Sequence, residues 1–320
     1  MVKQAMESPI FVLIAGFIVL GFAGEALLRG AVSAASHLKV PPLIIGLTII
    51  AFGTSAPELT VSVKAALNGQ PDISIGNVVG SNIANILLVL GLMAVVSPFA
   101  TQKGTLARDG SFMLGVSVVL VGLGFIGFIS PALGTLMLLG LIGFTIYLYS
   151  SSRTGADTQE AEAGVEENLL PGGLPVALLV LALGLAGVIW GADLMVDGAI
   201  LLARQLGISE AVIALSLVAL GTSLPELAVS MVAALRGHAS LAVGNIIGSN
   251  ISNILLILGA TSLIAPLPIS DLMAYRDIPI MLGVAALGVL FMGSGRRMSR
   301  LEGSICLALY ASYMGFIFTA

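Results

Sequence analysis

The chain has very little charge for its length, and this shortage excludes most soluble folds. Only 9% of its 320 residues are Asp, Glu, Lys or Arg, whereas 58% are hydrophobic. A soluble domain carries about a quarter charged residues, so this chain cannot cover a water-facing surface. Its apolar runs of roughly 20 residues fit membrane-spanning helices better than barrel strands, which alternate in hydrophobicity. The composition therefore predicts an all-α integral membrane protein.

Cysteine and histidine are also scarce, with one Cys and two His. The single cysteine, Cys306, excludes an internal disulfide and is too little for a cysteine metal site. The sequence has no Gly-Lys-Ser/Thr nucleotide loop and no basic patch that would suggest nucleic acid. The histidines, His37 and His238, are expected in polar connections. We therefore expect a protein that is not an enzyme, has no cofactor, and uses ion gradients for any transport.

A polar motif occurs twice inside long apolar runs. Gly-Thr-Ser-Ala-Pro-Glu at Gly53–Glu58 returns as Gly-Thr-Ser-Leu-Pro-Glu at Gly221–Glu226, 168 residues later. A second polar block, Gly76–Asn85, returns at the same offset as Gly244–Asn253. A carboxylate deep in an apolar helix is costly, and carboxylates at such positions usually serve a function. The duplication predicts one functional site built from two copies of a repeat.

Ten apolar spans are expected, five on each side of an acidic linker. The first repeat covers residues 1–150 with its motif region at 51–85, and the second covers 174–320 with its motif region at 219–253. Residues 151–173 form the linker, which reads as a solvated tether. The spans are expected at roughly residues 10–28, 41–67, 73–96, 112–128, 131–150, 174–194, 210–235, 241–264, 278–291 and 301–318.

An odd number of spans in each repeat means that the two halves enter the membrane from opposite sides. Such an inverted-topology repeat is common in secondary transporters, which bind their substrates near the midplane. In the predicted loops, nine Lys or Arg residues lie on one side and four on the other. The positive-inside rule then places the linker in the cytoplasm and both termini outside.

Pro57 and Pro225 predict breaks in the second and seventh spans, because proline lacks an N–H and crowds the preceding turn. The carbonyls freed one turn earlier, at residues 53–54 and 221–222, would converge with the motif hydroxyls and the glutamates. Such hard oxygen ligands suit Ca²⁺, Na⁺ or Mg²⁺ rather than Zn²⁺ or Cu⁺.

The second polar block adds hydroxyl and amide groups in the third and eighth spans, which are also expected to be broken. Ser81 and Asn85 are four residues apart and share a helical face, as do Ser249 and Asn253. For the four other asparagines, hydrogen bonding between helices is at least as good an interpretation as contact with an ion. These residues are Asn77, Asn82, Asn245 and Asn250. Outside the motifs, Glu25 and Asp193 are read as structural rim contacts with Arg29 and its neighbours.

The charge of the two glutamates narrows the choice of ion. Together they carry −2, which one Ca²⁺ would neutralise, and two or three Na⁺ could use the same oxygens. Mg²⁺ fits less well, because it retains its waters and requires a tight octahedron. A proton can also neutralise a buried glutamate, so the residues leave Na⁺ and H⁺ coupling open. A cation channel is the alternative outside the antiporters, and an intramembrane hydrolase using Ser55 or Ser223 would lack a base.

The paired blocks resemble the two α-repeats of the cation/calcium exchanger superfamily, and the chain is similar to prokaryotic sodium/calcium exchangers of ten helices. The resemblance covers nearly the whole chain except the linker. It implies Na⁺/Ca²⁺ antiport across the plasma membrane, here a prokaryotic inner membrane, by alternating access in which the first and sixth helices slide across the core. We also expect a monomer that needs no protein partner. Proton/calcium antiporters usually carry differently spelled repeats, which favours Na⁺.

The resemblance also implies ligand roles by position. Ca²⁺ would be held by Glu58, Glu226 and the carbonyls of Thr54 and Thr222. Asn85 and Asn253 would complete the centre of the arrangement; some relatives carry Asp in place of Asn253, a difference that bears on K⁺ dependence and Na⁺ stoichiometry. The Na⁺ sites would use the two glutamates, the hydroxyls of Ser55, Ser81, Ser223 and Ser249, and the carbonyls of Ala51 and Ala219.

Overall fold

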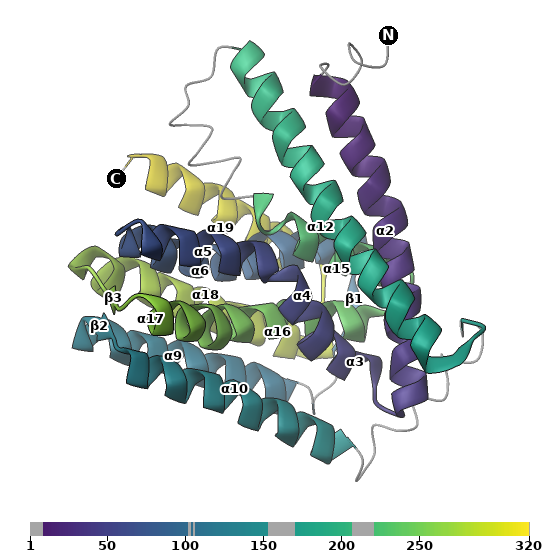
Figure 1. Cartoon of the computed structure of the whole chain (residues 1–320), viewed down its shortest axis with the longest axis horizontal. Coiled ribbons are helices and arrows are strands. Elements are labelled where there is room, and N and C mark those ends of the chain that lie inside the picture. The colour runs from purple at the N-terminus through teal and green to yellow at the C-terminus, as the bar shows by residue number, and fades with distance from the viewer. Residues whose placement is uncertain (1–8, 102–103, 105, 153–169, 207–220, 320) are drawn as a thin grey trace.

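The computed structural model describes residues 9–101, 104, 106–152, 170–206 and 221–319. These residues are almost entirely helical (Figure 1), with four two-residue strands between the helices. Seven helices in this part of the chain are long and apolar enough to cross a membrane, or eight if the bent pair Pro42–Thr54 and Ala56–Leu67 is one span. The all-α prediction is confirmed, and the count of ten spans stays a prediction.

The helices of the first half are joined by π-helical segments in three places, at Gly46–Ile50, Asn85–Leu90 and Leu106–Gly110. Two short strands, β1 (Phe99–Ala100) and β2 (Phe128–Ile129), follow the third and fourth spans. The helices are α2 (Pro9–Leu38), α3 (Pro42–Ile45), α4 (Ala51–Thr54), α5 (Ala56–Leu67), α6 (Pro71–Ala84), α7 (Gly91–Val96), α9 (Ser111–Ile126) and α10 (Pro131–Ser152).

The second half repeats this plan, with π-helical segments at Asn253–Leu258 and Met273–Asp277. Its strands are β3 (Leu267–Pro268) and β4 (Arg297–Met298), the latter preceded by a 3-10 turn at Ser294–Arg296. The helices are α12 (Gly173–Gln205), α15 (Leu224–Leu235), α16 (Ala239–Ser252), α17 (Gly259–Ile264), α18 (Ile278–Gly293) and α19 (Arg300–Thr319).

The predicted break in the second span is confirmed, since the helix bends by 42° between Thr54 and Ala56. The predicted breaks in the third and eighth spans are wrong. Pro71–Val96 and Ala239–Ile264 each run as one helix of 26 residues. These spans have no internal proline, so no backbone donor is lost, and the helix widens into a π-helical segment instead of breaking.

The first and sixth spans extend further than predicted, because α2 continues to Leu38 and α12 to Gln205. The polar residues after Arg29 lower the hydropathy without interrupting the helix, which ends only before Pro41 and Pro42. His37 therefore lies in the last turn of α2 and not in a connection. Most of the acidic linker and the first part of the seventh span, residues 153–169 and 207–220, lie outside the described residues.

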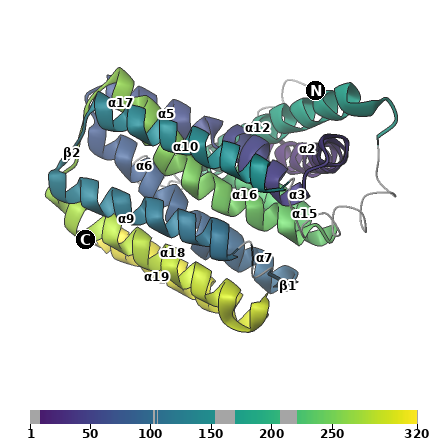
Figure 2. The ribbon, with the colours of Figure 1, turned by 90° about the horizontal axis from the view of Figure 1, so that it is seen from below.

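Helices α2 and α12 pack antiparallel along their length and lie together at one end of the molecule (Figures 1 and 2). Their contacts run from Leu13 against Gly198 to Gly30 against Leu181. A Cβ built on Gly30 would lie 2.4 Å from the backbone nitrogen of Leu181. Glycine is therefore required at this crossing, which brings equivalent helices of the two repeats into contact in opposite directions.

The strands also join the two halves. β1 pairs with β4 and β2 pairs with β3, both antiparallel, so each pair takes one strand from each repeat. The motif-bearing helices lie innermost: the most apolar stretch of Ala239–Ile264 is 94% buried, compared with 22% for α2 and for α12. The polar blocks are thus held in the protein interior, while α2 and α12 expose apolar side chains on the outside.

Candidate functional site

The two glutamates occupy equivalent positions at the start of a helix. Ser55 leaves the helical conformation, with φ −80° and ψ 6°, and α5 then begins, with Glu58 in its first turn. Ser223 does the same, with φ −88° and ψ 1°, and places Glu226 in the first turn of α15. Both carboxylates are fully buried. The positive end of each helix dipole stabilises a carboxylate in its first turn.

Helix α12 passes over both copies of the motif at their first glycines. A Cβ built on Gly53 would lie 2.2 Å from Cδ2 of Leu185, and one built on Gly221 would lie 2.4 Å from Cγ2 of Val196. A larger residue at either position would force the Leu185 or Val196 side chain of α12 to move. The glycine that opens each motif is thus explained by packing.

One hydroxyl group from each half reaches the carboxylate of Glu226 in the second half. Ser55 Oγ donates to Oε1 of Glu226 at 3.4 Å, and Ser249 Oγ donates to the same oxygen at 3.3 Å. The hydroxyl of Thr54 lies 3.5 Å from that of Ser249 and donates to Oδ1 of Asn245 at 3.3 Å. The two motifs therefore form one continuous polar cluster.

Several buried oxygens of this cluster have no hydrogen-bond partner among the described residues. An unpaired buried acceptor costs about 1–3 kcal/mol, and more when it is charged, so a set of them indicates a site for a cation or proton. The described part of the chain holds no group of three or more His, Cys, Asp or Glu side chains that could bind a metal. The unpartnered atoms are Glu58 Oε1 and Oε2, Glu226 Oε2, Ser223 Oγ, Asn85 Oδ1 and Asn253 Oδ1.

Four asparagines form a hydrogen-bond ladder between the repeats. The side-chain amide of Asn82 donates to the backbone carbonyl of Asn250 at 3.2 Å, and Asn250 donates back to the carbonyl of Asn82 at 3.4 Å. Asn85 donates to Oδ1 of Asn250, and Asn253 to Oδ1 of Asn82, each at 3.0 Å. The ladder uses the NH₂ groups of Asn85 and Asn253 and leaves their oxygens as acceptors.

Two further asparagines tie each motif helix to the helix that follows it. Asn77 donates to Ser62 Oγ at 3.0 Å and to the backbone carbonyl of Glu58 at 3.1 Å. Asn245 donates to Ser230 Oγ, the equivalent of Ser62, at 3.1 Å. These bonds fix α5 against α6 and α15 against α16, which confirms a helix–helix role for both asparagines.

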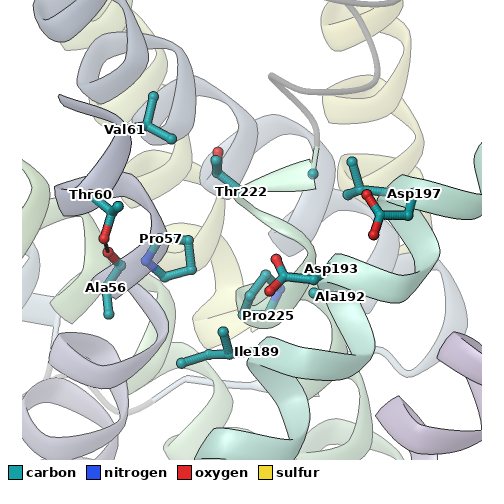
Figure 3. A pocket seen from close by; sticks show the side chains of 12 residues that line it. Ala56, Pro57, Thr60, Val61, Ile189, Ala192, Asp193, Asp197, Thr222 and Pro225 are labelled. Carbon is teal, nitrogen blue, oxygen red and sulfur yellow. Dashed lines mark hydrogen bonds between the residues drawn. The ribbon is translucent and has the colours of Figure 1, made fainter. Parts of the chain in front are cut away.

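An open pocket of about 530 Å³ between α5 and α12 reaches the second motif. Figure 3 shows Thr222, Pro57 and Pro225 lining it, with Asp193 and Asp197 on the α12 side. Glu25, the equivalent of Asp193, instead pairs with Arg29 at 2.8 Å, as predicted, and also with Arg236 at 2.8 Å. Motif spacing gave no signal for the contact with Arg236.

Comparison with known proteins identifies the family. The model of the family described as sodium/calcium exchanger protein matches residues 8–150 and 176–319. The chain belongs to the sodium/calcium exchanger family. It is 40% identical to the putative antiporter CaxA of Alkalimonas amylolytica over 98% of this chain and 100% of that one. It is 32% identical to the sodium/calcium exchanger MaX1 of Methanosarcina acetivorans, covering 96% of this chain and 97% of the relative.

The fold agrees with a solved member of the family. A structure of the sodium-calcium exchanger NCX_Mj superposes with a TM-score of 0.82 at 33% identity, covering 96% of this chain and 97% of that one. The chain is therefore an integral membrane protein of a family whose similar members include proteins named as antiporters and exchangers.

The exchanger brings some of its predicted ligand residues together through direct bonds and separates others. Thr54, Ser55, Ser249 and Glu226 lie in the cluster described above. The carbonyl of Ala51 accepts a hydrogen bond from the Ser55 amide at 3.1 Å, and the Thr54 hydroxyl lies 3.4 Å from it. Four other predicted ligands have side-chain oxygens without a hydrogen-bond partner among the described residues: Glu58, Ser223, Asn85 and Asn253. Thr222 lines the open pocket, whereas Ser81 lines a separate cavity of about 160 Å³ beside α19. Ala219 lies outside the described residues.

Proposed function

We propose that this exchanger is a secondary active antiporter that exchanges Na⁺ for Ca²⁺ by alternating access. The observation that supports the proposal most directly is the pair of fully buried carboxylates, one from each half, with unpartnered oxygens beside neutral hydroxyl and amide groups. Their combined charge of −2 matches one Ca²⁺, which takes six to eight oxygen ligands. Names of similar proteins, including the sodium/calcium exchanger MaX1, point to the same ions.

The proposed Ca²⁺ ligands are Glu58, Glu226 and the carbonyls of Thr54 and Thr222. Asn85 and Asn253 would contribute the oxygens that the asparagine ladder leaves as acceptors. The proposed Na⁺ sites share the glutamates and add the hydroxyls of Ser55, Ser81, Ser223 and Ser249 and the carbonyls of Ala51 and Ala219.

The proposed architecture is a pair of inverted five-span repeats, residues 1–150 and 174–320, joined by a cytoplasmic linker. The antiparallel packing of α2 on α12 supports this arrangement, as do the two strand pairs, each of which takes one strand from each repeat. The excess of Lys and Arg on the linker side supports both termini outside, in a prokaryotic inner membrane. A monomer is proposed, with the ions and the lipid bilayer as its partners.

If Na⁺ drives the exchange, the membrane potential contributes only when more than two Na⁺ move for each Ca²⁺. Moving one Ca²⁺ outward against about 100 mV costs roughly 4.6 kcal/mol, at about 2.3 kcal/mol for each charge. Two Na⁺ moving inward carry an equal charge, so only a third brings net charge inward and lets the membrane potential contribute. A proton could occupy an unpartnered carboxylate instead, which keeps H⁺/Ca²⁺ antiport as the second candidate.

The test is ⁴⁵Ca²⁺ uptake into proteoliposomes loaded with Na⁺, with Na⁺ and pH gradients imposed separately. The proposal predicts uptake that requires internal Na⁺, saturates with Ca²⁺ and is matched by ²²Na⁺ efflux. Uptake driven by a pH gradient alone would assign the protein to H⁺/Ca²⁺ exchange. Uptake that needs no counter-ion on the other side would show a channel.

A further inference from the structure

The two repeats differ in charge at one pair of equivalent positions on α2 and α12. Glu25 and Arg29 on α2 correspond, 168 residues later, to Asp193 and Asp197 on α12. On α2 the pair carries opposite charges and forms an ion pair at 2.8 Å. On α12 both residues are acidic and exposed, so they repel one another and form no ion pair.

The helix facing each pair differs in the same sense. Glu25 Oε2 is bonded at 2.8 Å to Arg236, the residue that follows α15. The equivalent residue in the first repeat, following α5, is Asn68, which carries no charge. Glu25 is thus held by two arginines from two helices, and Asp193 has no equivalent arginine.

The gap between α2 and α15 and the equivalent gap between α12 and α5 also differ in whether they reach the motif residues. Beside Glu25, α2 lies close against α15, and a Cβ built on Gly24 would be 3.0 Å from Val232. The groove of about 430 Å³ that Glu25 and Arg236 line on this side includes no motif residue, so it does not reach the site. Beside Asp193, α12 stands away from α5, and the pocket between them reaches Thr222 and Pro57 (Figure 3).

We propose that the ion pair of Glu25 with Arg236 is a one-sided latch that holds α2 against the end of α15, with Arg29 orienting the Glu25 carboxylate from within α2, so that the unloaded carrier favours the conformation open between α5 and α12. In an inverted repeat, the opposite conformation requires the two halves to exchange states around the shared site. That exchange breaks the latch on one side and forms no ion pair on the other. In the proposed topology the latched gap faces the cytoplasm and the open gap faces outward; the inference rests on alternating access in the proposed function.

The test uses thiol labelling at two equivalent positions: Thr60→Cys, which lines the open pocket, and Ala228→Cys on α15, the helix that packs against α2. Cys306 is fully buried and is replaced by Ser in both reporters. Without Ca²⁺ or Na⁺, the unmodified carrier is expected to label quickly at position 60 and slowly at 228. Glu25→Gln is expected to raise the ratio of the 228 rate to the 60 rate about fivefold, the size expected for ion pairs with half-exposed arginines.

The matched variants build the latch on the other side. Asp197→Arg combined with Asn68→Arg supplies Asp193 with the two arginines that Glu25 has, and is expected to slow labelling at position 60. Asp193→Asn alone is the control and is expected to leave the ratio within about twofold of the unmodified carrier. A ratio unchanged by both Glu25→Gln and the transplanted arginines would overturn the latch. Equal labelling of both reporters in the unmodified carrier would show no bias between the two conformations and would also overturn the latch, whereas ion exchange itself is tested by the ⁴⁵Ca²⁺ uptake assay above.

Discussion

The crossing of α2 and α12 gives a prediction whose size follows from the distances. Gly30→Ala would place a Cβ 2.4 Å from the nitrogen and 2.7 Å from the Cα of Leu181. Both are backbone atoms, so the helices themselves must separate by about 1 Å to restore van der Waals contact. Overpacking of this kind costs about 1–3 kcal/mol, from which the helix propensity of alanine returns about 1 kcal/mol. The expected net effect is a destabilisation of about 0–2 kcal/mol.

The matched control lies on the same helix. A Cβ built on Gly21 meets nothing within 4 Å, so Gly21→Ala gains helix propensity without a clash. The two variants should differ by about 1–3 kcal/mol, which corresponds to roughly 2–6 °C in the apparent Tm of a protein of this size. Thermal unfolding of the purified carrier in detergent, without Ca²⁺ or Na⁺, measures the difference. Equal Tm values, or a higher Tm for Gly30→Ala, would refute the close crossing.

Three substitutions test the buried polar network by the same assay. Ser230→Ala removes the acceptor that Asn245 uses at 3.1 Å, and a loss of about 1–3 kcal/mol is expected because the amide is left unpaired. Ser252→Ala should leave the Tm unchanged or higher, since the Ser252 hydroxyl has no partner among the described residues and Ala84 stands at the equivalent position. Asn250→Ala removes bonds on both sides of the ladder, so its Tm should fall further than that of Ser230→Ala. Equal Tm values for these two variants would contradict the ladder.

The repeat and the position of the break in the second span could be predicted from the sequence. A proline inside an apolar run removes a donor whatever surrounds it, so the bend before Pro57 follows from local chemistry. The third and eighth spans could not be predicted in the same way. Asn85 and Asn253 begin π-helical segments there, and whether a helix widens or breaks depends on the packing around it.

The partners of the polar side chains depend on the tertiary arrangement. The sequence shows that Asn82 and Asn250 are equivalent, and the structure shows that each donates to the backbone of the other. Nothing in the spacing of Glu25 and Arg236 indicates a contact between α2 and the end of α15. Sequence symmetry also gives no sign that Ser55 of the first repeat and Ser249 of the second both donate to the same oxygen of Glu226.

The most direct test of a shared ion site is Na⁺-driven ⁴⁵Ca²⁺ uptake by Glu58→Gln and Glu226→Gln, each compared with Glu302→Gln. Glu302 is a carboxylate outside the motifs that accepts a hydrogen bond from the backbone of Ser299 at 2.7 Å. Because each glutamate supplies half of the charge that balances Ca²⁺, both motif variants should lose nearly all Na⁺-dependent uptake, while Glu302→Gln retains it. Uptake that survives in either motif variant would contradict a single site built from both halves of the chain.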